Sequence, residues 1–282
     1  MYYILLLISA MLFSLQFFCQ QKYEQRNGTE VGAALSFSLY KGLAVMVMMF
    51  VIGKFKIEFT GFSFWLSGVY ALCYILMIYF SLKAFSVANL SVYSVFTMLG
   101  GMTLPFVVGV TLYSEDISVF KIICCLLIVI AVLLNIQKGQ SSKKAFLYYM
   151  LVFVLNGSVG VISKVHQASS IPHVDSTSCM FWSGMFTVII CCIWLKLSGN
   201  KIPFFKDMNL VYSAGDGFLN GIGDLILFIA VIHIPASVQY PLVTGGVMVF
   251  STIISILRKE KLRKLEYLAA AIAFVSSVLM AF

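Results

Sequence analysis

The repeat that decides the fold consists of SVYSVFTMLGGMTLPFVVGVTLYSEDIS, at residues 91–118, and SVQYPLVTGGVMVFSTIISILRKEKLR, at residues 237–263. Both stretches read Gly-Gly, then thirteen residues, then Glu, and sliding the chain by 145 residues superimposes these positions. The aligned positions are Gly100-Gly101 with Gly245-Gly246 and Glu115 with Glu260. Self-similarity at a fixed offset indicates a repeated structural unit, and one further apolar segment follows each copy.

Apolar segments long enough to cross a bilayer recur along the whole chain. Hydrophobic residues make up 61% of the 282 positions and charged residues only 11%, with a mean hydropathy of +1.00. Most of the surface must therefore face lipid, and the sequence predicts an all-α integral membrane protein with ten transmembrane helices. The predicted spans are 2–20, 31–53, 62–82, 88–112, 117–137, 145–163, 176–197, 209–232, 236–257 and 262–281.

Five spans fall in each copy of the repeat. The predicted units are residues 1–137 and 145–282, joined by a linker loop at 138–144. At a nearly equal offset the first helices also align, Tyr2-Tyr3 with Tyr148-Tyr149. Because five is odd, the second unit enters the membrane from the opposite side, which gives two inverted five-helix repeats suited to alternating access at their interface.

The repeated residues predict structural roles. The paired glycines allow their helices to approach a neighbouring backbone closely. Pro105 and Pro241 each remove a backbone donor and are expected to bend the helix that contains them. Glu115 and Glu260 lie in the short link before the last helix of each unit, where a carboxylate favours the positive helix N-terminus.

The basic residues indicate how the chain faces the two sides of the membrane. Alternate loops, beginning with the first, contain fourteen of the 19 Lys and Arg residues, and the loops on the opposite side contain four. The positive-inside rule therefore places the richer loops in the cytoplasm and both termini outside. The fourteen residues are Lys22, Arg26, Lys83, Lys138, Lys143, Lys144, Lys196, Lys201, Lys206, Arg258, Lys259, Lys261, Arg263 and Lys264.

Several classes of protein and site are excluded by the pattern. The first span lacks a basic flank and a small-residue cleavage site, so it is expected to be retained in the mature protein. The seven cysteines lie in or beside apolar spans without Cys-x-x-Cys or Cys/His metal spacing. No Walker, Gly-x-Ser-x-Gly or His-Glu-x-x-His motif occurs. We expect no catalytic residue, metal, other cofactor or nucleic-acid partner.

Residues 81–135 and 234–280 resemble the drug/metabolite transporter superfamily, most closely its ten-helix EamA-type members. The second stretch is also similar to the small multidrug resistance branch. The resemblance covers nearly the whole chain, although only these two stretches are specific. It implies a basket of two inverted five-helix repeats around a central cavity, and secondary transport of metabolites or drugs.

Two features depart from the family pattern. Members of the family have cytoplasmic termini, which conflicts with the orientation that the basic residues predict. The small multidrug transporters carry a membrane-embedded Glu in their first helix, whereas the matching spans here offer Gln16 and Asn156. The proton-coupling residue of that branch therefore has no counterpart at these positions.

The eighth predicted span carries a polar stripe. Asp216, Asn220 and Asp224 are spaced four residues apart and share one face of a helix. An ionisable residue inside a span is a functional hypothesis, because its burial in lipid is costly. One or both aspartates would bind a cationic substrate or carry coupling protons. Alternatively, Asp216 lies near the interface and Asp224 forms a buried ion pair with Lys41.

Lys41 lies about ten residues into the second span, where some EamA-type proteins carry a similar basic residue. It would bind a carboxylate or phosphate of the substrate, neutralise an aspartate of the eighth span, or extend its stem to the interface. Amide and aromatic side chains in other spans could orient a ligand. These candidates are Gln16, Tyr93, Asn156, Trp182, Gln239 and Tyr240. The histidines are assigned to loops, His166 and His173 between spans six and seven and His233 after span eight.

The sequence thus predicts a multi-pass protein of the cell membrane, with the lipid bilayer and a small-molecule substrate as its partners. The leading hypothesis is a secondary transporter that exports a small metabolite or organic cation, with protons as the candidate coupling ion. The alternative is a carrier of a phosphate-bearing substrate, such as a nucleotide sugar or lipid-linked sugar, in which Lys41 is essential. An intramembrane enzyme is disfavoured, because the two aspartates lie about 12 Å apart along one helix, too far to share a proton. No feature of the sequence defines the oligomeric state.

Overall fold

The computed structural model describes residues 2–87, 90–113, 123, 126, 127, 130, 143–199, 209–231 and 236–279. Within these ranges the regular secondary structure is α-helical, without a β-strand. The helices are α1 (Tyr2–Asn27), α2 (Val31–Ile52), α3 (Gly61–Phe85), α4 (Leu90–Tyr113), α6 (Lys143–Ala168), α7 (Ser176–Leu197), α8 (Asn209–Val231), α9 (Ala236–Leu257) and α10 (Lys264–Leu279).

Nine of the predicted spans correspond to these helices. The largest differences are at the ends of α1 and α6, which continue past residues 20 and 163 to Asn27 and Ala168. Polar residues such as Gln, Lys and Glu are good helix formers, so a helix does not have to end where its apolar run ends. The helix α6 begins at Lys143, within the linker predicted at 138–144, and residues 138–142 of that linker lie outside the described residues.

One predicted span lies almost entirely outside the described part of the structure. Residues 117–137 lie outside the described residues except at four isolated positions, and Glu115 also lies outside them. The presence of ten spans therefore stays a prediction.

Six helices of the described part, α1 to α4, α6 and α7, are long and apolar enough to cross a membrane. A helix satisfies its own backbone hydrogen bonds, as any segment within lipid must. Large apolar side chains are exposed on the surface of the described helices, among them Trp65, which is 72% exposed, and Leu197, which is 81% exposed. These features confirm the prediction of an all-α membrane protein.

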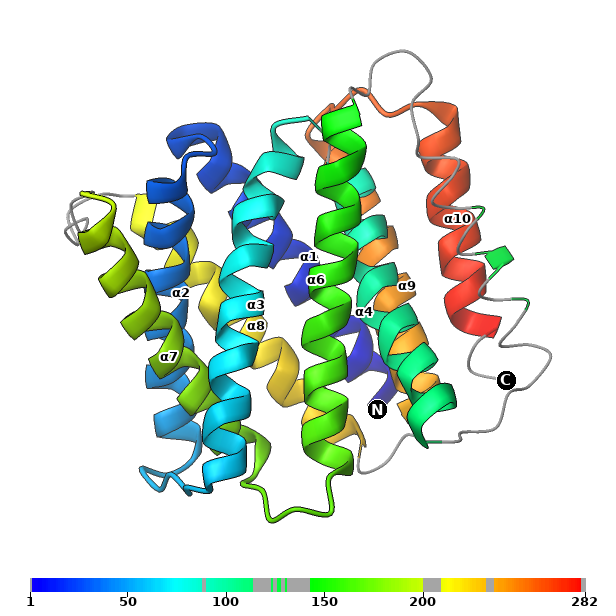
Figure 1. Cartoon of the computed structure of the whole chain (residues 1–282). Coiled ribbons are helices and arrows are strands. Elements are labelled where there is room, and N and C mark those ends of the chain that lie inside the picture. The colour runs from blue at the N-terminus through cyan, green and yellow to red at the C-terminus, as the bar shows by residue number, and fades with distance from the viewer. Residues whose placement is uncertain are drawn as a thin grey trace.

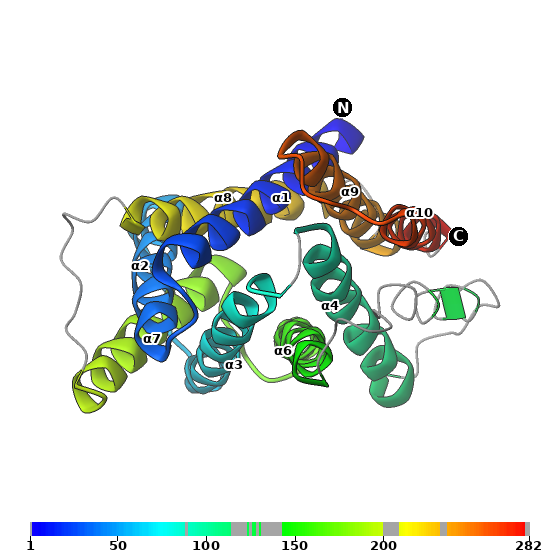
Figure 2. The same cartoon turned by 90° about the horizontal axis from the view of Figure 1, so that it is seen from above.

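The helices of the described part lie side by side (Figure 1). Contacts between neighbours join eight of them in a closed ring. Viewed from above, α8, α1 and α9 form one side and α3, α6 and α4 the other, while α2 and α7 close one end (Figure 2). Packing of α4 against α9 closes the opposite end, and α10 lies outside the ring against α9. Segments distant in sequence thus meet around one centre.

Two helix starts in the ring are fixed by side-chain caps, which satisfy backbone N–H groups that lack a partner within the helix. Thr60 accepts a hydrogen bond from the Ser63 backbone before α3, and Asp175 accepts two before α7, from Thr177 and Ser178. Burial raises the pKa of Asp175, but these hydrogen bonds outweigh it and hold the pKa below the ordinary carboxyl value.

The paired glycines lie at helix contacts. A Cβ atom at Gly100 or Gly101 would meet Phe153 or Asn156 of α6, and one at Gly246 would lie 2.8 Å from Ala10 Cβ of α1. Gly245 is buried in α9.

The repeated prolines and the second repeated glutamate also occupy described helices or links. Pro105 lies inside α4, where its carbonyl accepts a hydrogen bond from Lys164 Nζ at 3.3 Å. Pro241 belongs to α9, and its side chain lies outside the described part of the structure. Glu260 lies in the α9–α10 link and forms an ion pair of 2.9 Å with Arg258.

Candidate binding site

The candidate site lies where α8 packs closely against α2. A Cβ atom at Gly217 would lie 2.8 Å from Ala44 Cβ and 2.9 Å from the Lys41 carbonyl oxygen. Because glycine leaves this space free, the two helices pack closely at this height. The neighbouring residue on α8, Asp216, is thereby held against the side chain of Lys41.

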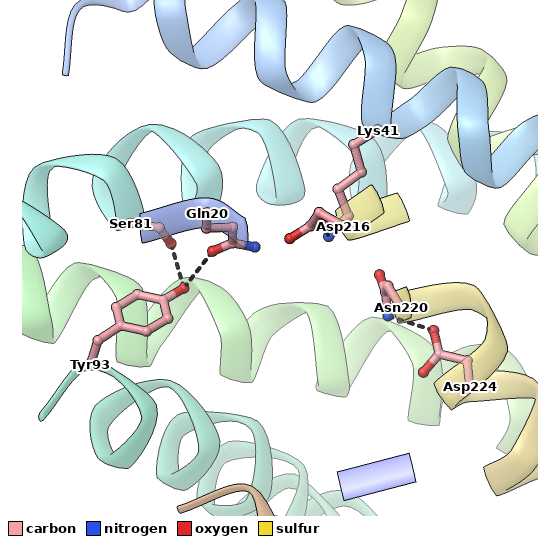
Figure 3. A network of polar contacts seen from close by, with 7 residues as sticks. All are labelled: Gln20, Lys41, Ser81, Tyr93, Asp216, Asn220 and Asp224. Carbon is pink, nitrogen blue, oxygen red and sulfur yellow. Dashed lines mark hydrogen bonds and ion pairs between the residues drawn. The ribbon is translucent and has the colours of Figure 1, made fainter. Parts of the chain in front are cut away.

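Lys41 and Asp216 form a buried ion pair (Figure 3). Their side chains are 2% and 0% exposed, and the Lys41 ammonium also lies 4.7 Å from the centre of the Tyr74 ring. A charge in such a place requires an opposite charge, because removal of either partner leaves the other uncompensated in a medium of low dielectric constant. The ion pair therefore joins α2 to α8 and leaves no net charge at this point.

Two interpretations of the sequence are wrong here. Asp216 is fully buried within the protein, and it is Asp216 rather than Asp224 that forms the ion pair with Lys41. Extension of the Lys41 stem to the interface is also contradicted, since Lys41 is only 1% exposed. The physical reason is that the Asp216 carboxylate compensates the charge of the Lys41 ammonium inside the protein, so the ammonium does not have to be solvated.

The other aspartate of the stripe has a different environment. Asp224 lies two helical turns beyond Asp216 and is partly exposed. Its Oδ2 atom accepts a hydrogen bond of 2.9 Å from Asn220 Nδ2 (Figure 3). Among the described residues, no lysine or arginine forms an ion pair with Asp224. Within the described part of the chain, Asp224 is thus a carboxylate with a neutral hydrogen-bond donor and without an ion-pair partner.

A pocket lies between α2, α3, α7 and α8, and Asp224 lines it. It is partly open to the exterior. Lys41 and Asn220 line it from α2 and α8, and Tyr70 and Tyr74 from α3. The two tyrosine rings are stacked, with centroids 6.1 Å apart and planes 9° from parallel. The described lining of the pocket therefore includes one carboxylate without an ion-pair partner and two aromatic rings.

A second polar network reaches the buried ion pair from the other side (Figure 3). The Tyr93 hydroxyl donates a hydrogen bond of 3.2 Å to Gln20 Oε1 and shares one of 2.8 Å with Ser81. Gln20 is fully buried, and its amide nitrogen is turned toward Asp216. Tyr93 of α4 is thus bonded to a residue of α1 whose amide nitrogen faces the carboxylate on α8, although Tyr93 does not line the pocket.

The remaining candidates are placed elsewhere. Gln16 is buried in α1, Asn156 donates a hydrogen bond of 2.6 Å to the Thr97 carbonyl, and Trp182 donates one of 2.8 Å to the Glu58 carbonyl. The pocket, as the described residues line it, includes none of these three. Gln239 and Tyr240 belong to α9, and their side chains lie outside the described part of the chain.

The assignment of the histidines to loops is wrong for His166. This residue lies near the end of α6, is 4% exposed, and places its Nε2 atom 2.9 Å from Ser63 Oγ of α3. His173 lies in the connection between α6 and α7 and is exposed, as predicted. His233 lies outside the described residues.

Sequence reasoning missed three residues of the site, Tyr70, Tyr74 and Gln20. The two tyrosines are four residues apart within the third span and therefore share a helix face, which is the same signal that identified the aspartates. Gln20 ends an apolar run and gave no signal of burial. Among the described residues, no cluster of three or more His, Cys, Asp or Glu side chains could hold a metal ion.

Comparison with known proteins adds evidence on the fold. No family model matches the sequence, and no curated protein matches it. The chain is similar to a solved structure described as "Crystal structure of protein", with a TM-score of 0.62 over 99% of this chain and 95% of that chain. The two sequences are 12% identical, so the likeness concerns the fold alone.

Proposed function

We propose that this protein is a multi-pass secondary transporter of the cell membrane that exports a small organic cation or cationic metabolite. The observation that carries the proposal is the carboxylate of Asp224, which has no ion-pair partner among the described residues, in a pocket lined by Tyr70 and Tyr74. A carboxylate attracts a cation directly, and an aromatic face attracts it through its quadrupole. Ligand sites combine apolar and aromatic walls with few polar groups in this way.

The charge of the pocket favours a cation over a phosphate-bearing substrate. A phosphate would need a free cation, and the ammonium of Lys41 is held by Asp216. It would also have to approach Asp224, whose charge repels it. A nucleotide sugar or lipid-linked sugar is therefore the weaker candidate.

Alternating access requires two halves that can move against each other around the site. The helix contacts support two units related by a shift of five helices. α1 packs against α8 and α9 as α6 packs against α3 and α4, and α2 packs against α8 as α7 packs against α3. These matched contacts are what two inverted five-helix repeats with ten spans predict.

Particular residues support the same relation. Gly101 faces Asn156 of α6, and Gly246 faces Ala10 of α1. Gly101 and Gly246 are 145 positions apart, and Ala10 and Asn156 are 146 apart, the offset that also aligns the first helices. Equivalent helix crossings therefore use equivalent residues in the two halves.

An intramembrane enzyme receives no support from the aspartates. Asp216 is paired with Lys41, and Asp224 is bonded to Asn220, so the two carboxylates have separate partners. Asp224 is instead the candidate group for proton coupling, because binding of a proton and binding of a cation at one carboxylate exclude each other.

The test is uptake of methyl-phenylpyridinium, a flat monovalent cation, into liposomes that contain the purified protein and carry a pH gradient. We expect accumulation by the unmodified protein and its loss in Asp224→Asn. Asp175→Asn is the matched control, since it makes the same chemical change at a helix cap outside the pocket, where asparagine also caps well.

Two results would contradict the proposal. One is that the folded protein neither binds nor accumulates the cation. The other is that Asp224→Asn transports as well as the control does. Transport of a nucleotide sugar that is lost in Lys41→Met but unaffected in Asp224→Asn would favour the phosphate-bearing alternative.

A further inference from the structure

Lys41 takes part in two environments at once. Its ammonium is paired with Asp216, which is fully buried, and its side chain also lines the pocket together with Asp224. Asp216 itself is not among the residues that line the pocket. The buried ion pair thus borders the pocket, with Lys41 among the lining residues and Asp216 behind it.

The charges around the ligand space follow from this arrangement. The stripe contributes two carboxylates, and Lys41 contributes one ammonium. One negative charge therefore remains for a ligand, and it resides on Asp224. Electrostatic interactions are strong inside a pocket of low dielectric constant, so the net charge of the pocket strongly affects which ligands bind.

We propose that Lys41 determines charge specificity: by neutralising Asp216, it leaves a single negative charge in the pocket, so that the site selects cations with one positive charge over cations with two. This inference rests on the proposed function, and it assigns Asp216 a compensating role rather than direct contact with the ligand.

A divalent cation meets two obstacles in this pocket. Its first charge is matched by Asp224, but its second has no free carboxylate among the described lining residues and faces the ammonium of Lys41. The same ammonium lies 4.7 Å from the centre of the Tyr74 ring, so a second positive charge placed at this ring would be repelled by it. A monovalent cation with a flat apolar body meets neither obstacle.

The experiment uses two probes of nearly the same shape, methyl-phenylpyridinium with one positive charge and dimethyl-bipyridinium with two. Their dissociation constants are measured by calorimetry on the full-length protein in detergent. Four forms provide a series of pocket charge. The unmodified protein has one net negative charge, Asp216→Asn has none, Lys41→Met has two, and Lys41→Met/Asp216→Asn again has one.

The expected results follow the net charge rather than the identity of the residues. The unmodified protein binds the monovalent probe at least about tenfold more tightly than the divalent one. Asp216→Asn weakens monovalent binding by about tenfold or more, since Lys41 is then free to pair with Asp224. The double variant restores it to within about threefold of the unmodified protein. Lys41→Met shifts the preference toward the divalent probe by about tenfold or more.

Several results would overturn the inference. If the folded double variant binds the monovalent probe as weakly as Asp216→Asn, the Asp216 carboxylate contacts the ligand itself. If Lys41→Met keeps the original preference between the probes, Lys41 does not set charge specificity. If Lys41→Met leaves Asp216 uncompensated and fails to fold, the comparison of Asp216→Asn with the double variant still decides whether Asp216 acts by neutralising Lys41 or by contacting the ligand.

Failure of this inference is distinguishable from failure of the proposed function. If the unmodified protein binds neither probe, the transport proposal fails along with it. If it binds the monovalent probe in a manner that depends on Asp224, and the charge series does not follow, only the role of Lys41 is wrong.

Discussion

Substitution of Gly100 by alanine tests whether the α4–α6 contact depends on the absence of a side chain. A Cβ atom at this position would meet the backbone of Phe153, at 2.7 Å from its carbonyl carbon and 2.8 Å from its Cα atom. A flexible side chain could rotate away, but a helix backbone can only move as a unit. Gly100→Ala therefore forces α4 and α6 apart along their contact.

The magnitude follows from two opposing effects. Carbon atoms prefer a separation of about 3.5–4.0 Å, so the helices must separate locally by about 1 Å. Alanine gains about 1 kcal/mol over glycine in helix propensity, whereas overpacking of a well-packed interior costs about 1–3 kcal/mol. Because the obstructing atoms belong to the backbone, we place the overpacking cost at its upper end. The expected net loss of stability is about 1–2 kcal/mol.

The assay is thermal unfolding of the purified protein in detergent, with Gly215→Ala as the matched control. Gly215 lies in α8, where a Cβ atom would meet only Cys19 Sγ at 3.9 Å, an ordinary contact distance. We expect Gly100→Ala to melt below the unmodified protein and Gly215→Ala to melt at or above it. If Gly100→Ala melts as high as the control variant, the close packing of α4 on α6 does not require glycine.

Three further interactions can be tested by substitution in the same unfolding assay. Lys41→Met should destabilise by about 3–5 kcal/mol, because it leaves a buried carboxylate uncompensated, and Lys41→Met/Asp216→Asn should recover most of this loss. Asp175→Ala removes the cap of α7 and should cost about 0.5–2 kcal/mol. Folding lowers the pKa of Asp175, so its carboxylate stabilises the folded protein above the ordinary carboxyl pKa. This stabilisation is lost as the pH falls through the lowered pKa. Asp175→Asn should abolish this pH dependence of stability. Tyr93→Phe removes the donor to Gln20 and should cost about 1–3 kcal/mol, and a stability equal to that of the unmodified protein would show that this hydrogen bond is dispensable.

The positions of the helices could be predicted because lipid imposes a simple requirement on sequence. An apolar run near the length of a bilayer is sufficient to identify a span, and nine runs correspond to helices of the described structure. The end of α1 could not be predicted in this way. Its last residues are polar, and hydropathy does not distinguish a helix that continues into the interface from a loop.

The face of α8 could be predicted, but the partner of each aspartate could not. Spacing of four residues shows that Asp216 and Asp224 share a face, yet it does not show which of them lies at the height of Lys41. That height depends on how far α8 slides along α2, which is set by packing at Gly217 against Ala44. Packing between distant segments is a property of the whole ring, and no local pattern contains it.

Burial along this one face of α8 gives the aspartates different roles. Asp216 is fully buried and holds the ammonium of Lys41, so its charge serves the contact between two helices. Asp224 is partly exposed, lines the pocket and has only the neutral Asn220 as a described polar partner. A carboxylate can attract a ligand only if its charge is not already matched. The same ion pair that fixes α2 against α8 therefore leaves Asp224 as the carboxylate to which the proposed function assigns the substrate.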